Sequence, residues 1–258
     1  MSHDDVAVDQ DGSVLTVTFD RPDQHNALTF DMYEALFEAC ERADADDGVR
    51  VLVVRGSGGR AFAAGTDISA FRDFRDGADG VAYEKLISRV VNRIEGVTVP
   101  TVGSVEGYCL GGGLALAAVC DLRVATRSSR FGVPIARTLG NCLSMNSVSV
   151  VAAHLGAART LDLLLRARLL TADEAAAAGF VAEVCDDGSL DEALREVVDT
   201  LLRHAPLTMW ASKVAVARLR RASLPDGDDL VSAAFGSEDF RRAVAGFGAG
   251  ERATWEGR

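Results

Sequence analysis

The run Tyr108-Cys-Leu-Gly-Gly-Gly-Leu-Ala-Leu-Ala-Ala-Val-Cys-Asp121 places three consecutive glycines between a short β-like segment, residues 101–105, and an alanine-rich segment typical of a helix. Glycine has no Cβ, so its backbone can approach a ligand closely. The first amides of a helix have no intrahelical partner and favour an anion. The run therefore predicts a turn that stabilises negative charge with main-chain donors. A tight turn in which glycine only permits close packing is the alternative.

A second loop of small residues has the same character. Arg60-Ala-Phe-Ala-Ala-Gly-Thr-Asp-Ile68 follows an apolar strand pattern at residues 51–55 and a glycine-rich turn at residues 56–59. It also leads into a predicted helix. Two such loops, each contributing one main-chain N–H, can form an oxyanion hole for a carbonyl that gains charge in a transition state.

Six motifs follow one another along the chain: Arg21-Pro-Asp-Gln-His-Asn-Ala-Leu28, Ala61-Phe-Ala-Ala-Gly-Thr-Asp67, Gly107-Tyr-Cys-Leu-Gly-Gly-Gly113, Cys120-Asp121, Phe131-Gly-Val-Pro134 and the segment Leu169–Val181. Together they resemble the enoyl-CoA hydratase/isomerase, or crotonase, superfamily over nearly the whole chain. The resemblance implies an α/β fold, a crotonase-like spiral of ββα units with a helical C-terminal oligomerisation region. It also implies a core with an acyl-CoA site at residues 1–195 and a helical trimerisation region at residues 196–258.

The same resemblance assigns the oxyanion-hole donors to the backbone N–H groups of Thr66 and Gly112. Because both donate from the backbone, threonine in place of the family's alanine keeps the donor. Arg60 would lie near a CoA phosphate and His25 near the adenine, with a solvated arginine and a packing histidine as the alternatives. The full substrate- and CoA-binding set comprises Gln24, His25, Arg60, Ala64, Thr66, Asp67, Ile68, Tyr108, Leu110, Gly111, Gly112, Pro134, Ile135 and Leu139.

The chain departs from the family at two positions that carry proton-transfer glutamates in enoyl-CoA hydratases. They match Ala115 and Ile135, and the residue beside the second is Ala136. General acid–base help contributes roughly 10²–10⁴-fold, so we expect neither efficient hydration by that pair nor an ordinary Δ3,Δ2-isomerase. An acyl-CoA lyase or isomerase, an atypical hydratase, a decarboxylase, a hydrolase and a C–C lyase stay open. A catalytically silent acyl-CoA-binding protein and an RNA-binding protein are the alternatives of other classes.

Polar residues between positions 137 and 146 replace the small residues that hydratases carry there. Arg137 is a candidate for pairing with a carboxylate of the substrate. Asn141, Ser144 and Asn146 are candidates for orienting water or for capping the next helix. Cys142 is a candidate nucleophile, with a structural thiol as the preferred interpretation. Glu106 is the acid nearest to the glycine run, although strand alternation can direct it away from the pocket.

Composition limits the partners and the compartment. The chain has 258 residues, with 38 acidic and 27 basic residues and a net charge of −11, which opposes nucleic-acid binding. The apolar run from Cys109 to Cys120 is too short to span a membrane. Five scattered cysteines and a polar, acidic first segment predict reduced thiols in the cytoplasm. No metal-ligand spacing occurs, and no cofactor is expected, since CoA would be part of the substrate.

The periodicity of apolar residues predicts the main elements. Strands are expected at residues 14–19, 51–54, 121–125 and 181–184, and helices at 29–43, 78–94, 190–204 and 206–221. Thr29 and Asp67 are predicted helix caps, Thr171 to Glu174 a capping box, and Asp121 a structural hydrogen-bonding residue. Apolar residues of the tail predict a subunit interface in a homotrimer or a dimer of trimers: Leu230, Phe235, Phe240, Phe247 and Trp255.

Overall fold

The protein folds around two sheets, and its computed structural model describes residues 5–222, 224–247 and 255–257. The larger sheet has the order β1-β2-β3-β5-β7-β10 and is parallel except for the β1–β2 pair. The smaller has the order β4-β6-β8-β9, and only β9 runs antiparallel to its neighbour. The strands are β1 (Val6–Asp11), β2 (Val14–Phe19), β3 (Val51–Gly56), β4 (Ala61–Ala63), β5 (Thr101–Val105), β6 (Tyr108–Leu110), β7 (Leu122–Thr126), β8 (Arg130–Gly132), β9 (Leu169–Thr171) and β10 (Glu183–Cys185).

The helices follow pairs of strands. Strands β3 and β4 precede α2, β5 and β6 precede α3, and β7 and β8 precede α4. The first strand of each pair joins the larger sheet and the second joins the smaller sheet. This confirms the expected spiral of ββα units. The helices are α1 (Phe30–Ala45), α2 (Gly77–Glu95), α3 (Gly112–Val119), α4 (Ile135–Thr138), α5 (Met145–Leu165), α6 (Ala172–Ala177), α7 (Leu190–Arg203), α8 (Pro206–Arg221), α9 (Asp228–Phe235) and α10 (Glu238–Gly246), with 3-10 turns η1 (Pro22–Gln24) and η2 (Ile68–Phe71).

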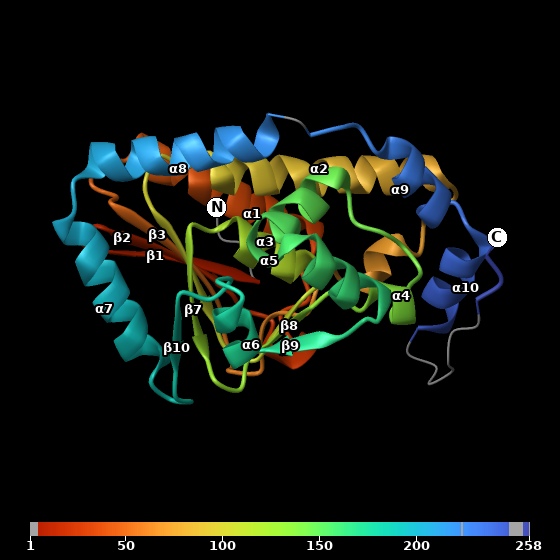
Figure 1. The fold of residues 1–258 in the computed structure, drawn as a ribbon, viewed down its shortest axis with the longest axis horizontal. Coiled ribbons are helices and arrows are strands. Elements are labelled where there is room, and N and C mark those ends of the chain that lie inside the picture. Colours follow the sequence, from red (N-terminus) through yellow and green to blue (C-terminus); the bar gives the residue numbers. More distant parts are fainter. Residues whose placement is uncertain (1–4, 223, 248–254, 258) are drawn as a thin grey trace.

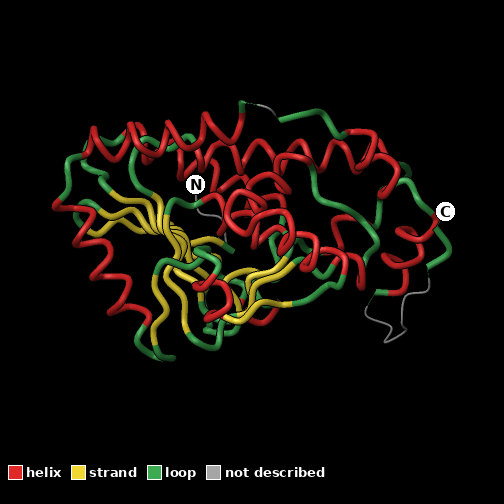
Figure 2. Tube along the Cα trace, in the orientation of Figure 1, coloured by secondary structure: helices red, strands yellow, loops and turns green. Residues whose placement is uncertain are grey.

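Apolar runs form the central strands because the larger sheet is covered on both faces. In β3, Val51 and Val53 pack toward α7, whereas Leu52 and Val54 join the main core. The strands gather beneath the long helices (Figure 2), and α7 lies at the opposite end of the molecule from α9 and α10 (Figure 1). The two faces of β3 therefore pack into two separate hydrophobic clusters, the main core and the cluster beneath α7.

The predicted helix caps are present. The Thr29 side chain accepts a hydrogen bond from the Met32 amide at the start of α1. Asp67 accepts from the Ser69 amide at the start of η2, and Thr171 and Glu174 form the predicted capping box of α6. Asp121 is structural, as expected: its carboxylate accepts from the Thr101 amide at 2.7 Å and from Lys213 at 2.6 Å.

The C-terminal helices differ from the sequence prediction. The proposed boundary between residues 195 and 196 lies inside α7. Phe235 and Phe240 are each only 1% exposed and pack on α2 with Phe71, Phe74 and Tyr83, so their assignment to a subunit interface was wrong. Gly80 of α2 makes room for this packing, because an added Cβ there would come within 2.3 Å of the Phe235 side chain. Since glycine has no Cβ, α9 can pack directly onto α2.

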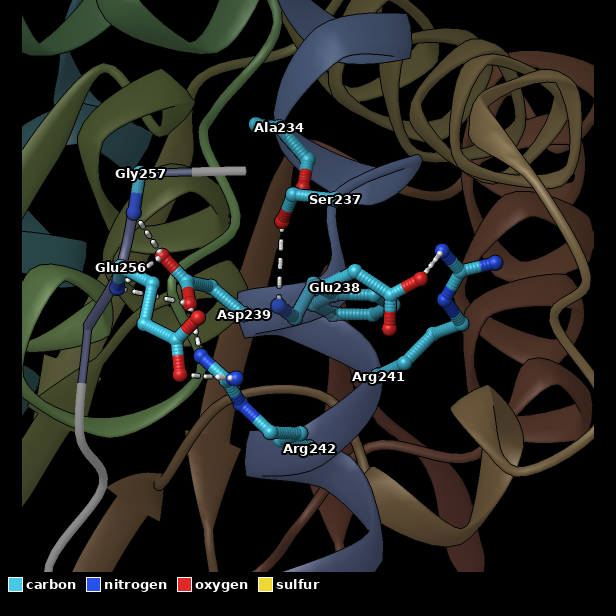
Figure 3. Close-up of polar contacts among 9 residues, drawn as sticks. Ala234, Ser237, Glu238, Asp239, Arg241, Arg242, Glu256 and Gly257 are labelled. Atoms are coloured by element: carbon cyan, nitrogen blue, oxygen red, sulfur yellow. Dashed lines mark hydrogen bonds and ion pairs between the residues drawn. The ribbon is translucent and has the colours of Figure 1, made fainter.

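The last described residues are fastened to α10 through one carboxylate. Asp239 accepts hydrogen bonds from the amides of Glu256 and Gly257, at 2.9 Å and 2.7 Å, and also pairs with Arg242 (Figure 3). Leu230, Phe247 and Trp255 remain 58%, 53% and 42% exposed. These three side chains are still available for the predicted contact between subunits, which stays a prediction.

Among the described helices, α5 alone is long and apolar enough to cross a membrane by length and composition. Gly156 breaks it with non-helical backbone angles, φ 71° and ψ 162°. The helix also packs against α2, α3 and α8 within the fold. These contacts are those of a helix in a folded domain.

Candidate active site

A cavity of about 240 Å³ lies where η2, α2, the β6–α3 turn and α4 meet. Its wall contains both predicted loops. The residues that line it are Ala64, Gly65, Thr66, Ile68, Phe71, Tyr83, Glu84, Ile87, Leu110, Gly111, Gly112, Ala115, Pro134, Ile135, Thr138, Leu139, Asn141, Leu143, Ser147 and Phe247.

The first loop exposes the amide of Thr66. Thr66 forms a parallel bridge with Leu28, in which the Leu28 amide donates to the Gly65 carbonyl at 2.8 Å and the Asp67 amide donates to the Leu28 carbonyl at 2.9 Å. A bridge of this kind uses the groups flanking Thr66 and turns the N–H of Thr66 itself to the other side. Within the described ranges, the Thr66 amide donates no main-chain hydrogen bond.

The second loop brings the amide of Gly112 to the same wall. Gly112 is the first residue of α3, so its N–H has no partner inside the helix. In the part of the chain that the structure describes, it donates no main-chain hydrogen bond either. An added Cβ on Gly65 would lie 3.9 Å from the Gly112 nitrogen, which shows how closely the loops approach. Two unpaired amides on touching loops can donate to one shared oxygen.

A chain of hydroxyl groups supports the loops. The Tyr33 hydroxyl lies 2.9 Å from Thr66 Oγ1, which lies 2.6 Å from the Tyr83 hydroxyl. Burial raises the pKa of both tyrosines, so both stay neutral. An added Cβ on Gly112 would come within 2.3 Å of the Tyr33 hydroxyl. Any other residue at this position would therefore displace the Tyr33 hydroxyl from the hydroxyl chain.

Arg123 holds the other end of α3. Its side chain is 3% exposed and donates to the carbonyls of Ala117, Ala118 and Cys120, at 3.1, 3.3 and 2.6 Å. Its Nε also donates to the Phe180 carbonyl. These are the carbonyls that a helix leaves unpaired at its C-terminus, and a cation there is favourable. The sequence analysis missed this residue, which lies two positions after the Cys120-Asp121 motif.

The two positions that the sequence analysis matched to proton-transfer glutamates line the cavity. Ala115 is 1% exposed on α3, and Ile135 begins α4. Neither side chain can hold or transfer a proton. Any acid–base chemistry in this cavity must therefore come from a residue elsewhere on its wall.

Glu84 is an acid on that wall that the sequence analysis missed. It lies on α2 and is 4% exposed, and one carboxylate oxygen accepts from the Ser144 amide at 2.8 Å. Burial raises the pKa of Glu84 from 4.5 to about 7, against the lowering effect of the Ser144 bonds. The signal was present in the sequence, since position 84 falls three residues before Ile87 on the buried stripe of α2.

The other polar candidates fall into different roles. Asn141 lines the cavity, and its buried Oδ1 has no hydrogen-bond partner within the described residues. Ser144 caps α5, and burial raises the pKa of the Cys142 thiol to about 12, as expected for a structural cysteine. Arg137 is exposed on α4 and is not among the residues that line the cavity.

The predicted substrate- and CoA-binding residues divide into two groups. Nine of them line the cavity: Ala64, Thr66, Ile68, Leu110, Gly111, Gly112, Pro134, Ile135 and Leu139. The others lie outside it: Gln24, His25, Arg60, Asp67 and Tyr108.

His25, Arg60 and Tyr108 form an outer patch connected to the cavity rim through Ala64. The Ala64 amide donates to the His25 carbonyl at 3.1 Å, and the Tyr108 amide donates to the Arg60 carbonyl at 3.1 Å. The rings of His25 and Tyr108 lie edge to face, with centroids 6.4 Å apart. Asp67 instead pairs with Arg21 at 3.0 Å.

Known proteins are similar to this chain over nearly its whole length. The family model for enoyl-CoA hydratase/isomerase matches residues 9–258. A short-chain-enoyl-CoA hydratase of Clostridium acetobutylicum is 28% identical over 96% of this chain and 95% of its own length. A probable enoyl-CoA hydratase of Rhizobium meliloti is 32% identical over the full length of both chains. The fold matches that of a methylmalonyl-CoA decarboxylase complexed with 2S-carboxypropyl CoA, with a TM-score of 0.89, 23% identity and full coverage of both chains. The chain belongs to the enoyl-CoA hydratase/isomerase family, within the crotonase superfamily.

Proposed function

We propose that this protein is an enzyme that binds an acyl-CoA thioester and stabilises negative charge on the thioester oxygen. The observation that carries the proposal is the pair of unpaired amides, Thr66 and Gly112, on two touching loops beside one cavity. Family membership and the CoA complex of the decarboxylase with the same fold support the choice of ligand. The outer patch around His25 and Arg60 would receive the CoA nucleotide.

The chemistry follows from where charge develops. When a thioester loses a proton from its α carbon, electron density moves onto the carbonyl oxygen. Two fixed N–H groups stabilise that oxygen more strongly than the neutral carbonyl, and removal of one such donor typically costs roughly 3–4 kcal/mol. An enolate is common to isomerisation, decarboxylation and C–C cleavage, so the amides alone do not select one reaction.

Infrared spectroscopy tests the proposal directly. Crotonyl-CoA labelled with ¹³C at the carbonyl should show a carbonyl band at lower wavenumber when bound, because both amides polarise the bond. A CoA thioether without the carbonyl is the matched control and should bind more weakly. Binding without any shift of the carbonyl band would contradict the oxyanion hole. Incubation with enoyl-, malonyl- and 3-oxoacyl-CoAs, followed by mass spectrometry, would then identify the reaction.

A second candidate function is acyl-CoA binding without catalysis. The apolar side chains of Ala115 and Ile135 at the cavity wall favour it. A binding protein would give the shifted carbonyl band but no turnover and no exchange of the substrate's α protons. The proton-exchange experiment described below therefore separates the two functions.

Self-association through the helical C-terminal region is part of the proposal. Helix α8 exposes Leu207, Val216 and Leu219 at 73%, 68% and 79%, and α5 exposes Leu165 at 74%. Burial of such side chains between subunits would remove apolar surface from water. We expect a soluble, cytoplasmic protein that light scattering shows to be a trimer or hexamer. A variant with Leu207→Glu and Leu219→Glu should form an assembly of lower mass. A wild-type monomer at micromolar concentration would contradict this arrangement.

A further inference from the structure

Glu84 is buried without a positive partner. Its side chain is 4% exposed, and within the described residues no lysine, arginine or histidine forms an ion pair with it. Its neighbour Lys85 points elsewhere and pairs with Asp228 of α9 at 2.6 Å. A buried carboxylate without a counter-charge is costly, so such a group is uncommon at a purely structural position.

The groups around Glu84 are neutral near pH 7. Tyr83 precedes it on α2, Tyr33 faces it from α1, and Cys142 faces it from the segment before α5; burial raises the pKa of all three. Ser144 supplies the hydrogen bond to its carboxylate. With the pKa of Glu84 at about 7, both its acid and base forms are populated at neutral pH. A group of this kind can both accept and return a proton.

Its location connects it to the two amides. Glu84, Thr66 and Gly112 line the same cavity. Tyr83, the residue before Glu84 on α2, links the two regions because its hydroxyl forms a hydrogen bond with Thr66 Oγ1. Glu84 thus lines the space that would receive the acyl group. The positions used by hydratases, Ala115 and Ile135, lie on the same wall and are apolar.

We propose that Glu84 is the proton-transfer residue of this cavity and removes a proton from the α carbon of the bound acyl-CoA. This inference rests on the proposed function. In the step, the α C–H bond breaks and an O–H bond forms on the Glu84 carboxylate. The C–H electron pair forms the C=C bond of the enolate, and the carbonyl π pair moves onto the oxygen held by the two amides. Return of the proton to carbon reverses each change.

Deuterium exchange tests this step without a need to know the natural reaction. Butyryl-CoA carries α protons and no double bond to hydrate, so wash-in of deuterium from D₂O reports only enolate formation. We expect exchange by the wild-type protein, and a loss of at least about 100-fold in Glu84→Gln. Glutamine keeps the acceptor for the Ser144 amide. Glu106→Gln is the matched control, because Glu106 is outside the residues that line the cavity, and it should exchange like wild type.

The outcomes distinguish this inference from the proposed function. Equal exchange by wild type and Glu84→Gln would overturn the role of Glu84, as would a wild-type protein that shifts the carbonyl band yet exchanges nothing. A wild-type protein with no shifted band would reject the proposed function and the inference with it. Glu84→Asp should recover part of the exchange, and butyryl-CoA affinity should be the same in Glu84→Gln and wild type. If Glu84→Gln fails to fold, the Glu84→Asp rate and its pH profile decide the question.

Discussion

Two sets of groups that line the cavity are built in different ways. The first set, Thr66 and Gly112, offers main-chain amides from two glycine-containing loops. The second set consists of side chains: Ala115 and Ile135 stand where the sequence resemblance predicts glutamates, and the buried acid is Glu84 on α2. Backbone donors depend on the path of the chain, which tolerates few changes. A side-chain acid can come from any helix that reaches the cavity.

Removal of the Thr66 amide should have the largest effect on this comparison. Thr66→Pro deletes one of the two donors, and we expect deuterium exchange into butyryl-CoA to fall by roughly 10²–10³-fold. Thr66→Ala keeps the amide and loses only the hydroxyl, so its rate should stay much closer to wild type. A Thr66→Pro protein that folds and exchanges at the Thr66→Ala rate would show that the Thr66 amide contributes nothing to the exchange reaction.

Glu84 should make the free energy of unfolding depend on pH. The pKa of Glu84 is raised on folding, from 4.5 to about 7, so the folded state binds the proton more tightly than the unfolded state. Stability from this group is complete below pH 4.5 and is lost as pH rises through 7, by roughly 3 kcal/mol. Urea unfolding of wild type and Glu84→Gln between pH 4.5 and 8 measures it. Parallel curves for the two proteins would contradict the raised pKa.

Glutamates can be introduced at the two positions where the sequence resemblance predicts them, to test whether the apolar side chains there limit hydration. Wild type should hydrate crotonyl-CoA far more slowly than a hydratase with two glutamates. Ala115→Glu with Ile135→Glu should create measurable hydration, with a rate gain well below the roughly 10²–10⁴-fold that acid–base help can give. The gain is small because Ala115 is 1% exposed, and a carboxylate there is strained and harder to ionise. Rapid hydration by wild type would direct attention to Glu84 as the acid.

The smallest effect should come from the hydroxyl chain behind the loops. Tyr33→Phe removes one hydrogen bond to Thr66 Oγ1 and leaves both amides and Glu84 in place. A neutral hydrogen bond contributes about 1 kcal/mol, so exchange should fall roughly fivefold. A loss as large as that of Thr66→Pro would mean that the tyrosine positions the amide rather than only packing behind it.

The sequence predicted the parts of this molecule that depend on local pattern. The ββα spiral and the Thr29 and Asp67 caps are confirmed, because strand alternation and cap chemistry act within a few residues. Pairing of the second strands into a separate small sheet was not predicted, because these strands are only three residues long.

Long-range contacts account for the errors. Phe235 and Phe240 seemed too sparse for a core because their partners lie on α2 and η2, more than 150 residues earlier in the chain. Glu84 was passed over because it lies outside all six motifs, and only the fold brings it to the same cavity as the glycine run. Arg137 was selected because it begins a polar segment expected near the acyl pocket, yet it lies exposed on α4.

Arg123 bears on the rate of any reaction at the opposite end of α3. Water around a dissolved thioester must reorient as charge grows on the oxygen, and that reorganisation energy is part of the barrier. A short helix fixed by a guanidinium at its last carbonyls already has its first amide aligned before the substrate arrives. In the proposed oxyanion hole, part of this reorganisation energy is supplied during folding, through a residue that is not among those lining the cavity.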